Sequence, residues 1–211
     1  MGMAERARAS WERVAPDYDT ATAGLERRFL APSRPWVCGR ASGEVLEVAI
    51  GTGANLPYYA DGVRLTGLDA DPTMLDAARR KAREGGCDAT LVEGDALALP
   101  FGDASFDAVV CTFALCGVPD ERAALLEMVR VLRPGGDLLL ADHVAASNPV
   151  VLALEHAVTT VTARSHGEYF TRRPRLVVDA LGLHVVASRR RTFGALEEVH
   201  ARTPARGAAA A

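Results

Sequence analysis

The sequence has no apolar run that approaches the roughly 20 residues needed to cross a bilayer. Residues 1–14 are rich in Ala, Arg and Glu and lack the apolar stretch of a signal peptide. The 4 cysteines form no Cys-x-x-Cys pair, and neither the histidines nor the acidic pairs have the spacing of metal ligands. These absences predict a cytoplasmic protein with reduced cysteines, no integral membrane segment and no metal site.

Neither sign of charge dominates the chain. Its 24 Lys and Arg residues stand against 27 Asp and Glu residues, which gives a net charge of -3. Proteins that bind nucleic acids usually carry a basic patch, so we expect no nucleic-acid partner. Arginines cluster at 172–173 and 189–191, where a solvated surface is the simple interpretation and a site for an anionic substrate is the alternative.

Short apolar strands alternate with helical segments from residue 43 onward. Such alternation predicts an α/β fold, in which a parallel sheet carries helices on both faces. Only a short turn near Gly194 joins the last two predicted strands, which permits an antiparallel hairpin but no parallel crossover. We therefore expect a seven-stranded, mostly parallel sheet that ends in an antiparallel hairpin. The predicted strands are 44–49, 63–69, 89–93, 106–111, 137–141, 183–193 and 195–201, and the predicted helices are 4–14, 22–38, 73–84, 119–132, 148–164 and 171–181.

The length of 211 residues suits one domain with a substantial core. The chain has no internal repeat, and we expect a single domain over residues 1–204. Residues 205–211 are mostly alanine, offer little to bury and are expected to form a disordered tail. A monomer and a homodimer are both compatible with these properties.

A glycine turn, Gly51-Thr52-Gly53, directly follows the first predicted strand. Glycine permits a tight turn and lets the backbone approach a ligand closely. In open α/β sheets, ligands bind at the carboxyl ends of the strands, which is where this turn is expected to lie. A tight turn without a ligand is the alternative, because a lone Gly-x-Gly is common.

Two acidic residues follow the next two strands. Asp69 ends the strand 63–69, close to the spacing at which a carboxylate meets a ribose in nucleotide-binding units. A helix cap is the alternative for Asp69, but Asp71, directly before Pro72, suits that role better. Asp95 follows the strand 89–93, where it is placed to accept from an adenine amino group or, alternatively, to form an Asx turn. Together the two carboxylates predict a nucleoside site.

A nicotinamide dinucleotide is the competing ligand. Its fingerprint requires a third glycine where this chain has Leu56, and leucine would crowd the helix that approaches a pyrophosphate. The chain also lacks the Tyr-x-x-x-Lys pair of hydride chemistry, since Tyr169 is followed four places later by Arg173. An NAD(P)-dependent oxidoreductase is therefore disfavoured, and a nucleoside ligand without phosphates fits better.

Successive segments of the chain resemble the motifs of class I S-adenosylmethionine-dependent methyltransferases, in order and at the family's spacing. They are similar to the group that includes the ubiquinone and menaquinone biosynthesis methyltransferases. This resemblance implies a Rossmann-like fold, with S-adenosylmethionine as the methyl donor and S-adenosylhomocysteine as its product. It also implies an N-terminal helical lid (1–40), a donor-binding core (41–143) and acceptor-side elements (144–204). The matching segments are 45–59, 67–75, 94–101 with 105–110, and 131–136.

The same resemblance implies which residues bind the donor. The backbone at Gly51 and Gly53 would run past the methionine moiety, and the Asp69 carboxylate would bind the ribose. Tyr18 would close over the methionine carboxylate, although a helix-packing aromatic is the alternative for this residue. The expected donor-binding residues are Tyr18, Glu47, Ala49, Gly51, Thr52, Gly53, Asn55, Asp69, Ala70, Met74, Gly94, Asp95 and Ala96 (the last two beside the adenine), and Cys111, Thr112 and Phe113 (beside the methionine).

A narrower resemblance concerns the acceptor. Residues 51–59, 111–120 and 142–144 are similar to a subgroup that contains thiol S-methyltransferases and bacterial phospholipid N-methyltransferases. That subgroup carries Gly-Cys-His-Leu-Thr-Arg where this chain has Gly-Glu-Tyr-Phe-Thr-Arg at 167–172, so the match departs at residues 168 and 169. The expected substrate-contacting residues are Cys116, His166, Tyr169 and Arg172.

The need for a catalytic base depends on the acceptor. A thiol with a pKa of about 8.5 is already partly thiolate at neutral pH, whereas a phenol with a pKa of about 10 is mostly neutral. His143 lies just past the strand 137–141 and is the candidate general base. A histidine that only anchors a loop is the alternative.

We expect an enzyme, an S-adenosylmethionine-dependent methyltransferase that acts on a small molecule, and we favour a thiol as the acceptor. An N-, O- or C-acceptor on a lipid, a quinone-type compound or a secondary metabolite stays open, and so does a non-catalytic module that binds S-adenosylmethionine. DNA methylation is disfavoured, because the chain has neither an Asn/Asp-Pro-Pro-Tyr run nor a Pro-Cys nucleophile.

Overall fold

The computed structural model describes residues 18–165 and 169–205 of the chain. Within these residues, strands β1 to β7 form one sheet in the order β3-β2-β1-β4-β5-β7-β6. β1 to β5 run parallel, and β7 runs antiparallel to both of its neighbours, β5 and β6. The expected mostly parallel sheet with an antiparallel hairpin is confirmed. The strands are β1 (Glu44–Val48), β2 (Arg64–Asp69), β3 (Ala89–Glu93), β4 (Phe106–Thr112), β5 (Leu132–His143), β6 (His184–Arg191) and β7 (Leu196–Arg202).

The strand order brings the carboxyl ends of β1, β2 and β4 side by side. β1 lies between the other two, and the register pairs Val48 with both Leu68 and Cys111. The chain first builds the sheet outward from β1 through β2 and β3, and then returns to the opposite side of β1 as β4. Such a reversal leaves a crevice at the carboxyl edge, where open α/β sheets bind ligands.

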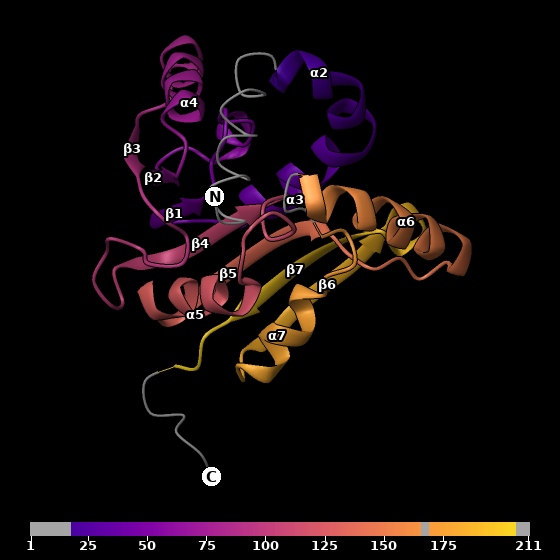
Figure 1. Ribbon diagram of the computed structural model, residues 1–211. Coiled ribbons are helices and arrows are strands. Elements are labelled where there is room, and N and C mark those ends of the chain that lie inside the picture. The colour runs from indigo at the N-terminus through magenta and orange to yellow at the C-terminus, as the bar shows by residue number, and fades with distance from the viewer. Residues whose placement is uncertain (1–17, 166–168, 206–211) are drawn as a thin grey trace.

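Helices cover both faces of the sheet (Figure 1). α5 (Glu121–Val131) and α7 (Pro174–Ala180) contribute to the apolar core on one face, and α3 (Arg34–Cys38) and α4 (Pro72–Gly85) contribute to the core on the other. β4 is buried along nearly its whole length, as expected for a central strand of a parallel sheet. The remaining helical elements are α2 (Tyr18–Leu25), η2 (Glu26–Leu30), η3 (Ala31–Ser33), η4 (Leu56–Tyr58), α6 (Pro149–Ser165) and η5 (Thr192–Gly194).

Residues 18–38 form several short helical pieces, so the prediction of one continuous helix over 22–38 was wrong. α2 continues into the π-helical η2, which is followed by the 3-10 helix η3 and then by α3. Two prolines, Pro32 and Pro35, explain the breaks, because proline has no amide hydrogen and its ring clashes with the preceding turn of a helix. Each proline accordingly lies at the start of its own piece.

Local signals set the ends of α4 more closely. The Asp71 carboxylate accepts a hydrogen bond from the Thr73 amide at 2.7 Å, which confirms Asp71 as the helix cap. Gly86 ends the helix in the left-handed conformation with φ 65. β5 is longer than the predicted 137–141, because residues 132–136 join the strand through an irregular register opposite the start of β4.

Three of the expected features lie outside the described residues: the helix 4–14, the site residue His166, and residues 206–211 of the tail. Over the described part of the chain, every helix is too short or too polar to cross a membrane.

Candidate functional site

Asp69 ties the glycine turn to the end of β2. Its Oδ2 accepts a hydrogen bond from the Gly51 amide at 2.8 Å, and its Oδ1 accepts one from the Asp71 amide at 3.0 Å. Burial raises the pKa of Asp69, while the hydrogen bonds from these amides oppose the rise. Each carboxylate oxygen still has a free lone pair, so Asp69 can accept from a further hydroxyl group at this edge.

The two glycines of the turn have different reasons to be glycine. Both lie in the left-handed region, Gly51 at φ 57 and Gly53 at φ 79. A Cβ atom on Gly53 would lie 2.7 Å from Cδ1 of Leu56, whereas a Cβ atom on Gly51 would meet no atom within 4 Å. Gly53 therefore allows close packing, and Gly51 faces open space that a ligand can fill. Leu56 opens only the 3-residue η4, so the segment that directly follows this turn is not the long helix whose amino end binds a pyrophosphate.

Two non-glycine residues at the same edge also have left-handed backbones. Ala49 follows β1 with φ 56, and Phe113 follows β4 with φ 55. The left-handed conformation costs roughly 1–2 kcal/mol for a residue with a Cβ atom. Strained backbone of this kind concentrates where ligands bind, and here it marks the carboxyl ends of two neighbouring strands.

A buried polar network lies beneath the turn. Asn55 donates from Nδ2 to Glu47 Oε1 at 2.8 Å, and the Tyr59 hydroxyl donates to Glu47 Oε2 at 2.7 Å. The Arg34 guanidinium donates from Nη1 to Asn55 Oδ1 at 2.7 Å and to Thr112 Oγ1 at 3.2 Å. Burial raises the pKa of Glu47 to about 7, against the opposing effect of these hydrogen bonds and of Arg34. The network joins β1, β4 and the glycine turn to the N-terminal helices.

The N-terminal helices close over the turn through two further links. The Thr52 hydroxyl donates to the Asp19 carboxylate at 2.7 Å, and Lys81 of α4 pairs with the same carboxylate at 2.9 Å. Arg34 pairs with Glu26 of η2 at 2.6 Å. A cavity of about 410 Å³ lies between these helices, the segment after the turn and Lys81. Tyr18 begins α2, but its side chain lies outside the described residues.

The adenine end of the expected site is more open. Asp95 is exposed, and its Oδ1 accepts from the Leu97 amide at 2.8 Å, so it forms the Asx turn that was the alternative for this residue. The Gly94 amide donates to the Asp69 carbonyl at 3.0 Å, which holds the two loops together. Ala70 is exposed at the end of β2 and Met74 is buried in α4. Donor contacts of Ala70, Met74, Gly94, Asp95 and Ala96 stay predictions.

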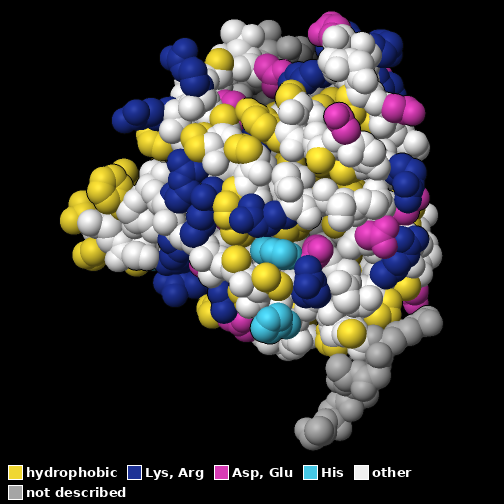
Figure 2. Space-filling model, turned by 180° about the vertical axis from the view of Figure 1, so that it is seen from behind, with side chains coloured by type: hydrophobic (Ala, Val, Ile, Leu, Met, Phe, Trp, Pro, Cys, Tyr) yellow, Lys and Arg dark blue, Asp and Glu magenta, His cyan; other side chains and the backbone are white. Residues whose placement is uncertain are grey.

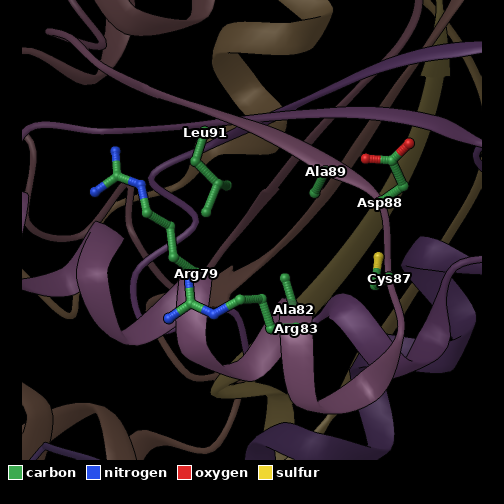
Figure 3. A pocket seen from close by; sticks show the side chains of 7 residues that line it. All are labelled: Arg79, Ala82, Arg83, Cys87, Asp88, Ala89 and Leu91. Atoms are coloured by element: carbon green, nitrogen blue, oxygen red, sulfur yellow. The ribbon is translucent and has the colours of Figure 1, made fainter.

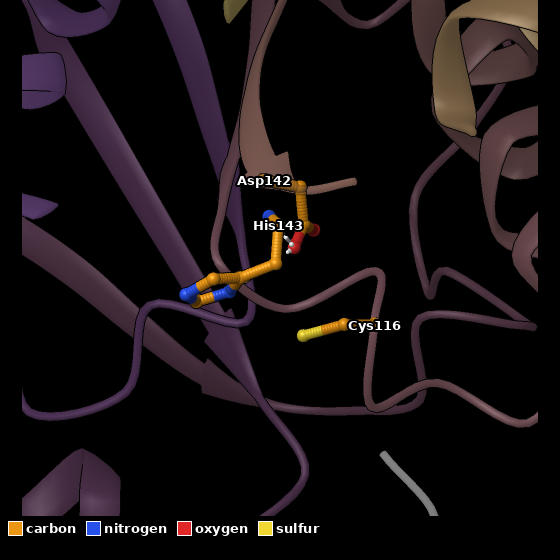
Figure 4. A group of neighbouring side chains, drawn as sticks. All are labelled: Cys116, Asp142 and His143. Carbon is orange, nitrogen blue, oxygen red and sulfur yellow. Dashed lines mark hydrogen bonds and ion pairs between the residues drawn. The ribbon is translucent and has the colours of Figure 1, made fainter. Parts of the chain in front are cut away.

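Cys116, Asp142 and His143 meet on the other side of β4 (Figure 4), although the sequence showed no spacing of metal ligands. Their potential ligand atoms lie within 4.8 Å of one another. The Asp142 carboxylate is already occupied, because it accepts from the Leu115 amide at 2.7 Å, the His143 amide at 2.7 Å and the Cys116 thiol. Burial raises the pKa of Asp142 to about 7. Asp142 therefore holds the loop that carries Cys116 against the end of β5, where His143 lies.

The His143 imidazole lies between two aromatic rings. Its centroid is 5.5 Å from that of Phe113 and 5.3 Å from that of Phe170, the latter edge to face. Its Nδ1 atom is buried and has no hydrogen-bond partner among the described residues. Burial lowers the pKa of His143 to about 4, so the ring is neutral at pH 7. This arrangement offers an aromatic wall with one unpartnered nitrogen.

Tyr169 and Arg172 border the same region, where the Tyr169 amide and the Arg172 guanidinium bond within the protein. The Tyr169 amide donates to the Cys116 carbonyl at 2.8 Å. Arg172 donates to the carbonyls of Leu115 and Val118, and its guanidinium lies 4.6 Å from the Tyr169 ring centroid. These contacts give Arg172 a positioning role, and contact of either residue with substrate stays a prediction.

A second pocket, of about 320 Å³, lies between the end of α4 and the start of β3 (Figure 3). Because β3 is parallel to β1 and β2, this pocket is at the amino edge of the sheet. It is therefore remote from the glycine turn and from Asp69.

Comparison with known proteins supports an assignment for this edge. A methyltransferase domain family matches residues 46–140. Phosphatidylethanolamine N-methyltransferase of Cereibacter sphaeroides is 38% identical over 144 residues, which cover 64% of this chain and 71% of that protein. Demethylmenaquinone methyltransferase of Deinococcus radiodurans is 40% identical over 136 residues, which cover 61% of this chain and 56% of that protein. A SAM-dependent methyltransferase from Thermotoga maritima has the same fold, with a TM-score of 0.69, 20% identity, and coverage of 92% of this chain and 98% of that one.

The chain belongs to the class I S-adenosylmethionine-dependent methyltransferases. The family implies S-adenosylmethionine as the cofactor of this methyltransferase, and the open space beside Gly51, next to the Asp69 carboxylate, fits a nucleoside-bearing ligand.

Sequence reasoning missed three residues of this methyltransferase site. Arg34 is buried and joins the N-terminal helices to Asn55 and Thr112, and Glu26 pairs with it. Asp142 holds Cys116 and His143 together. An arginine between two prolines gives no periodic signal, and only its position at the end of the helical segment could have drawn attention to it. Asp142 could have been found as the polar residue that ends an apolar strand.

The raised pKa of Glu47 predicts a pH dependence of stability. A carboxyl whose pKa is higher in the folded state than in the unfolded state stabilises the fold at low pH, and this contribution is lost as pH rises through the folded value. With a pKa raised from 4.5 to about 7, we expect the free energy of unfolding to fall by roughly 2 kcal/mol more between pH 5.5 and 8 in the wild type than in Glu47→Gln. Urea denaturation at both pH values measures this difference. Equal pH dependence in the two proteins would show that Glu47 is ionised in the folded state as it is in the unfolded one.

Proposed function

We propose that this methyltransferase binds S-adenosylmethionine at the carboxyl edge of β1, β2 and β4 and transfers its methyl group to a small-molecule acceptor beside His143. The observation that carries the proposal is the hydrogen bond from Gly51 to Asp69 beside open space at the switch point of the sheet. Phe113, with its strained backbone, follows the neighbouring strand β4. His143 and Phe170 lie on the far side of Phe113, where an acceptor would come next to the donor's methyl group.

The residues present fit the donor group by group. Asp69 accepts from the ribose hydroxyls, with each charged hydrogen bond contributing about 1.5–3 kcal/mol. Gly51 leaves room for the methionine portion, and Cys111 and Thr112 end β4 beside it. Arg34, in contact with both Asn55 and Thr112, positions these two side chains against the methionine. Asp95 with Ala96 borders the adenine.

The chemistry asks little of the protein beyond binding. S-adenosylmethionine, when bound, supplies a methyl group activated by its sulfonium. The protein orients the acceptor in line and excludes water from the reaction. The helices over the turn, linked to it through the Asp19–Thr52 and Arg34–Asn55 hydrogen bonds, provide the cover.

The environment of His143 favours an acceptor that needs little help from a base. A histidine with a pKa of about 4 is neutral at pH 7 but removes a proton weakly. A thiol, which is partly ionised at neutral pH, suits such a residue better than a phenol or a carbon acid. The relatives named for phospholipid and quinone substrates support an N- or C-acceptor on an amphiphilic molecule as the second candidate. Cytoplasmic location, a monomeric or homodimeric state and the absence of a nucleic-acid partner stay predictions.

Removal of the ribose ligand should weaken donor binding. We expect Asp69→Ala to lower the affinity for S-adenosylhomocysteine by roughly 2–3 kcal/mol, or about 30- to 150-fold, because charged hydrogen bonds are lost. Isothermal titration calorimetry measures the affinity. The matched control is Asp88→Ala, an exposed carboxylate at the amino edge of the sheet, which should bind as the wild type does. Unchanged affinity in Asp69→Ala would contradict the ribose assignment.

An acceptor screen tests the reaction itself. Transfer of a labelled methyl group should be detected with small thiols before phenols, and amines and quinol precursors cover the second candidate. Donor binding without transfer to any of these acceptors would favour the non-catalytic binding module.

The effect of His143→Ala on the rate, compared between acceptors and between pH values, tests whether His143 acts as a base. With an acceptor that must lose its proton in the reaction, His143→Ala should lower kcat by about 100-fold. With a thiol assayed above its own pKa the loss should shrink, because the thiolate is already formed. His184→Ala changes an exposed histidine on β6 and serves as the control. A full rate for His143→Ala with every acceptor and at every pH would remove the base hypothesis.

A further inference from the structure

α6 carries an apolar stripe on its exposed side. Val150 is 77% exposed, Leu154 is 64% exposed and Val158 is 41% exposed. Residues four apart lie on one face of a helix, so these three side chains form a continuous row. A contiguous row of exposed aliphatic side chains marks a candidate interaction site.

The turn between β6 and β7 extends this stripe. Phe193 is 73% exposed and has φ 58, and Thr192 before it has φ 51. The Asn148 amide donates to the Phe193 carbonyl at 3.2 Å, which places the turn beside the start of α6. A strained turn thus displays an aromatic side chain to water beside the start of α6, and this combination points to a binding role.

Arg190 of β6 borders the apolar stripe, whereas Arg189 lies over the Trp36 ring and Arg191 donates to the Ser33 hydroxyl, both in the N-terminal helices. Arg190 donates to the Ser147 hydroxyl at 2.7 Å and to the Ala145 carbonyl at 3.3 Å, directly before α6 begins. The glutamates that pair with Arg189, Arg190 and Arg191 are Glu197 and Glu198, whose side chains are nearly buried, so the guanidinium groups form the outer layer. Figure 2 shows hydrophobic side chains gathered on the projection that α6 forms, with Lys and Arg side chains along its border.

We propose that α6, together with Phe193 and Arg190, docks this protein on the surface of a bilayer that contains anionic phospholipid. An apolar face bordered by basic side chains is the pattern of a helix that lies in the interface plane, with its aliphatic row in the acyl boundary and its cations among the headgroups. A second copy of the chain is the alternative occupant of this face, and the oligomeric state of the protein tests it.

The position of α6 relates the docking face to the acceptor side of the methyltransferase. α6 begins at Pro149, a few residues after His143, at the carboxyl edge of the sheet. A docked protein therefore has this edge close to the lipid surface, within reach of an amphiphilic molecule. Docking of this face on lipid does not depend on which atom of the acceptor receives the methyl group.

Vesicle co-sedimentation of the full chain tests the proposal. We expect binding to vesicles of phosphatidylcholine with phosphatidylglycerol, weaker binding to pure phosphatidylcholine, and loss of affinity as salt is raised. Leu154→Glu should lower the affinity for the mixed vesicles at least tenfold. The matched control is Leu126→Glu, because Leu126 is a 45% exposed leucine on α5. It should bind vesicles as the wild type does, and calorimetry with S-adenosylhomocysteine should show that both variants are folded.

Two results would overturn the proposal. Absence of vesicle binding by the wild type, or equal binding by the wild type and Leu154→Glu, would show that α6 does not dock on lipid. A wild-type dimer in analytical ultracentrifugation that Leu154→Glu converts to a monomer would assign the face to a second copy of the chain. Neither result would touch the proposed methyl transfer, which the donor titration and the acceptor screen test separately.

Discussion

The pair of hydrogen bonds that Asp69 accepts from the amides of Gly51 and Asp71 is the interaction on which the rest of the site depends. These two bonds join the turn after β1, the end of β2 and the start of α4 at one point. Because the strands are parallel, the end of β4 lies beside this point as well. The open space next to Gly51, the strained backbones of Ala49 and Phe113, and the cover of the N-terminal helices are all arranged around it.

Much of the polar structure near this point is buried and carries a cost in stability. Glu47 and Asp142 both have pKa values raised to about 7 by burial, and both hold loops that an apolar residue could not hold. The Glu47 carboxylate accepts hydrogen bonds from Asn55 and Tyr59, while the Asp142 carboxylate accepts them from two backbone amides and the Cys116 thiol. Two buried carboxylates thus organise the two halves of the edge, one on the donor side and one on the acceptor side.

The fold could be predicted closely from the sequence because its signals are local. Apolar runs of strand length alternate with helical segments, and the short connection at Gly194 excludes a parallel return. The prediction of one continuous helix over 22–38 was wrong because Pro32 and Pro35 clash with the preceding helical turn and divide the segment into pieces. The start of β5 was also placed too late, because residues 133–136 look like a turn in the sequence, whereas Leu132 before them already pairs with Phe106 of β4.

The sequence by itself determined the succession of strands and helices, the glycine turn and the acidic residue that ends the second strand, since each depends on residue type and spacing along the chain. The tertiary structure alone decided the contacts between distant segments. Arg34 reaches Thr112, and Cys116 reaches Asp142, only because the sheet brings their elements together. The neutral state of His143 and the exposure of the α6 stripe also come from packing, because burial and solvent contact depend on what surrounds a residue and not on its neighbours in the chain.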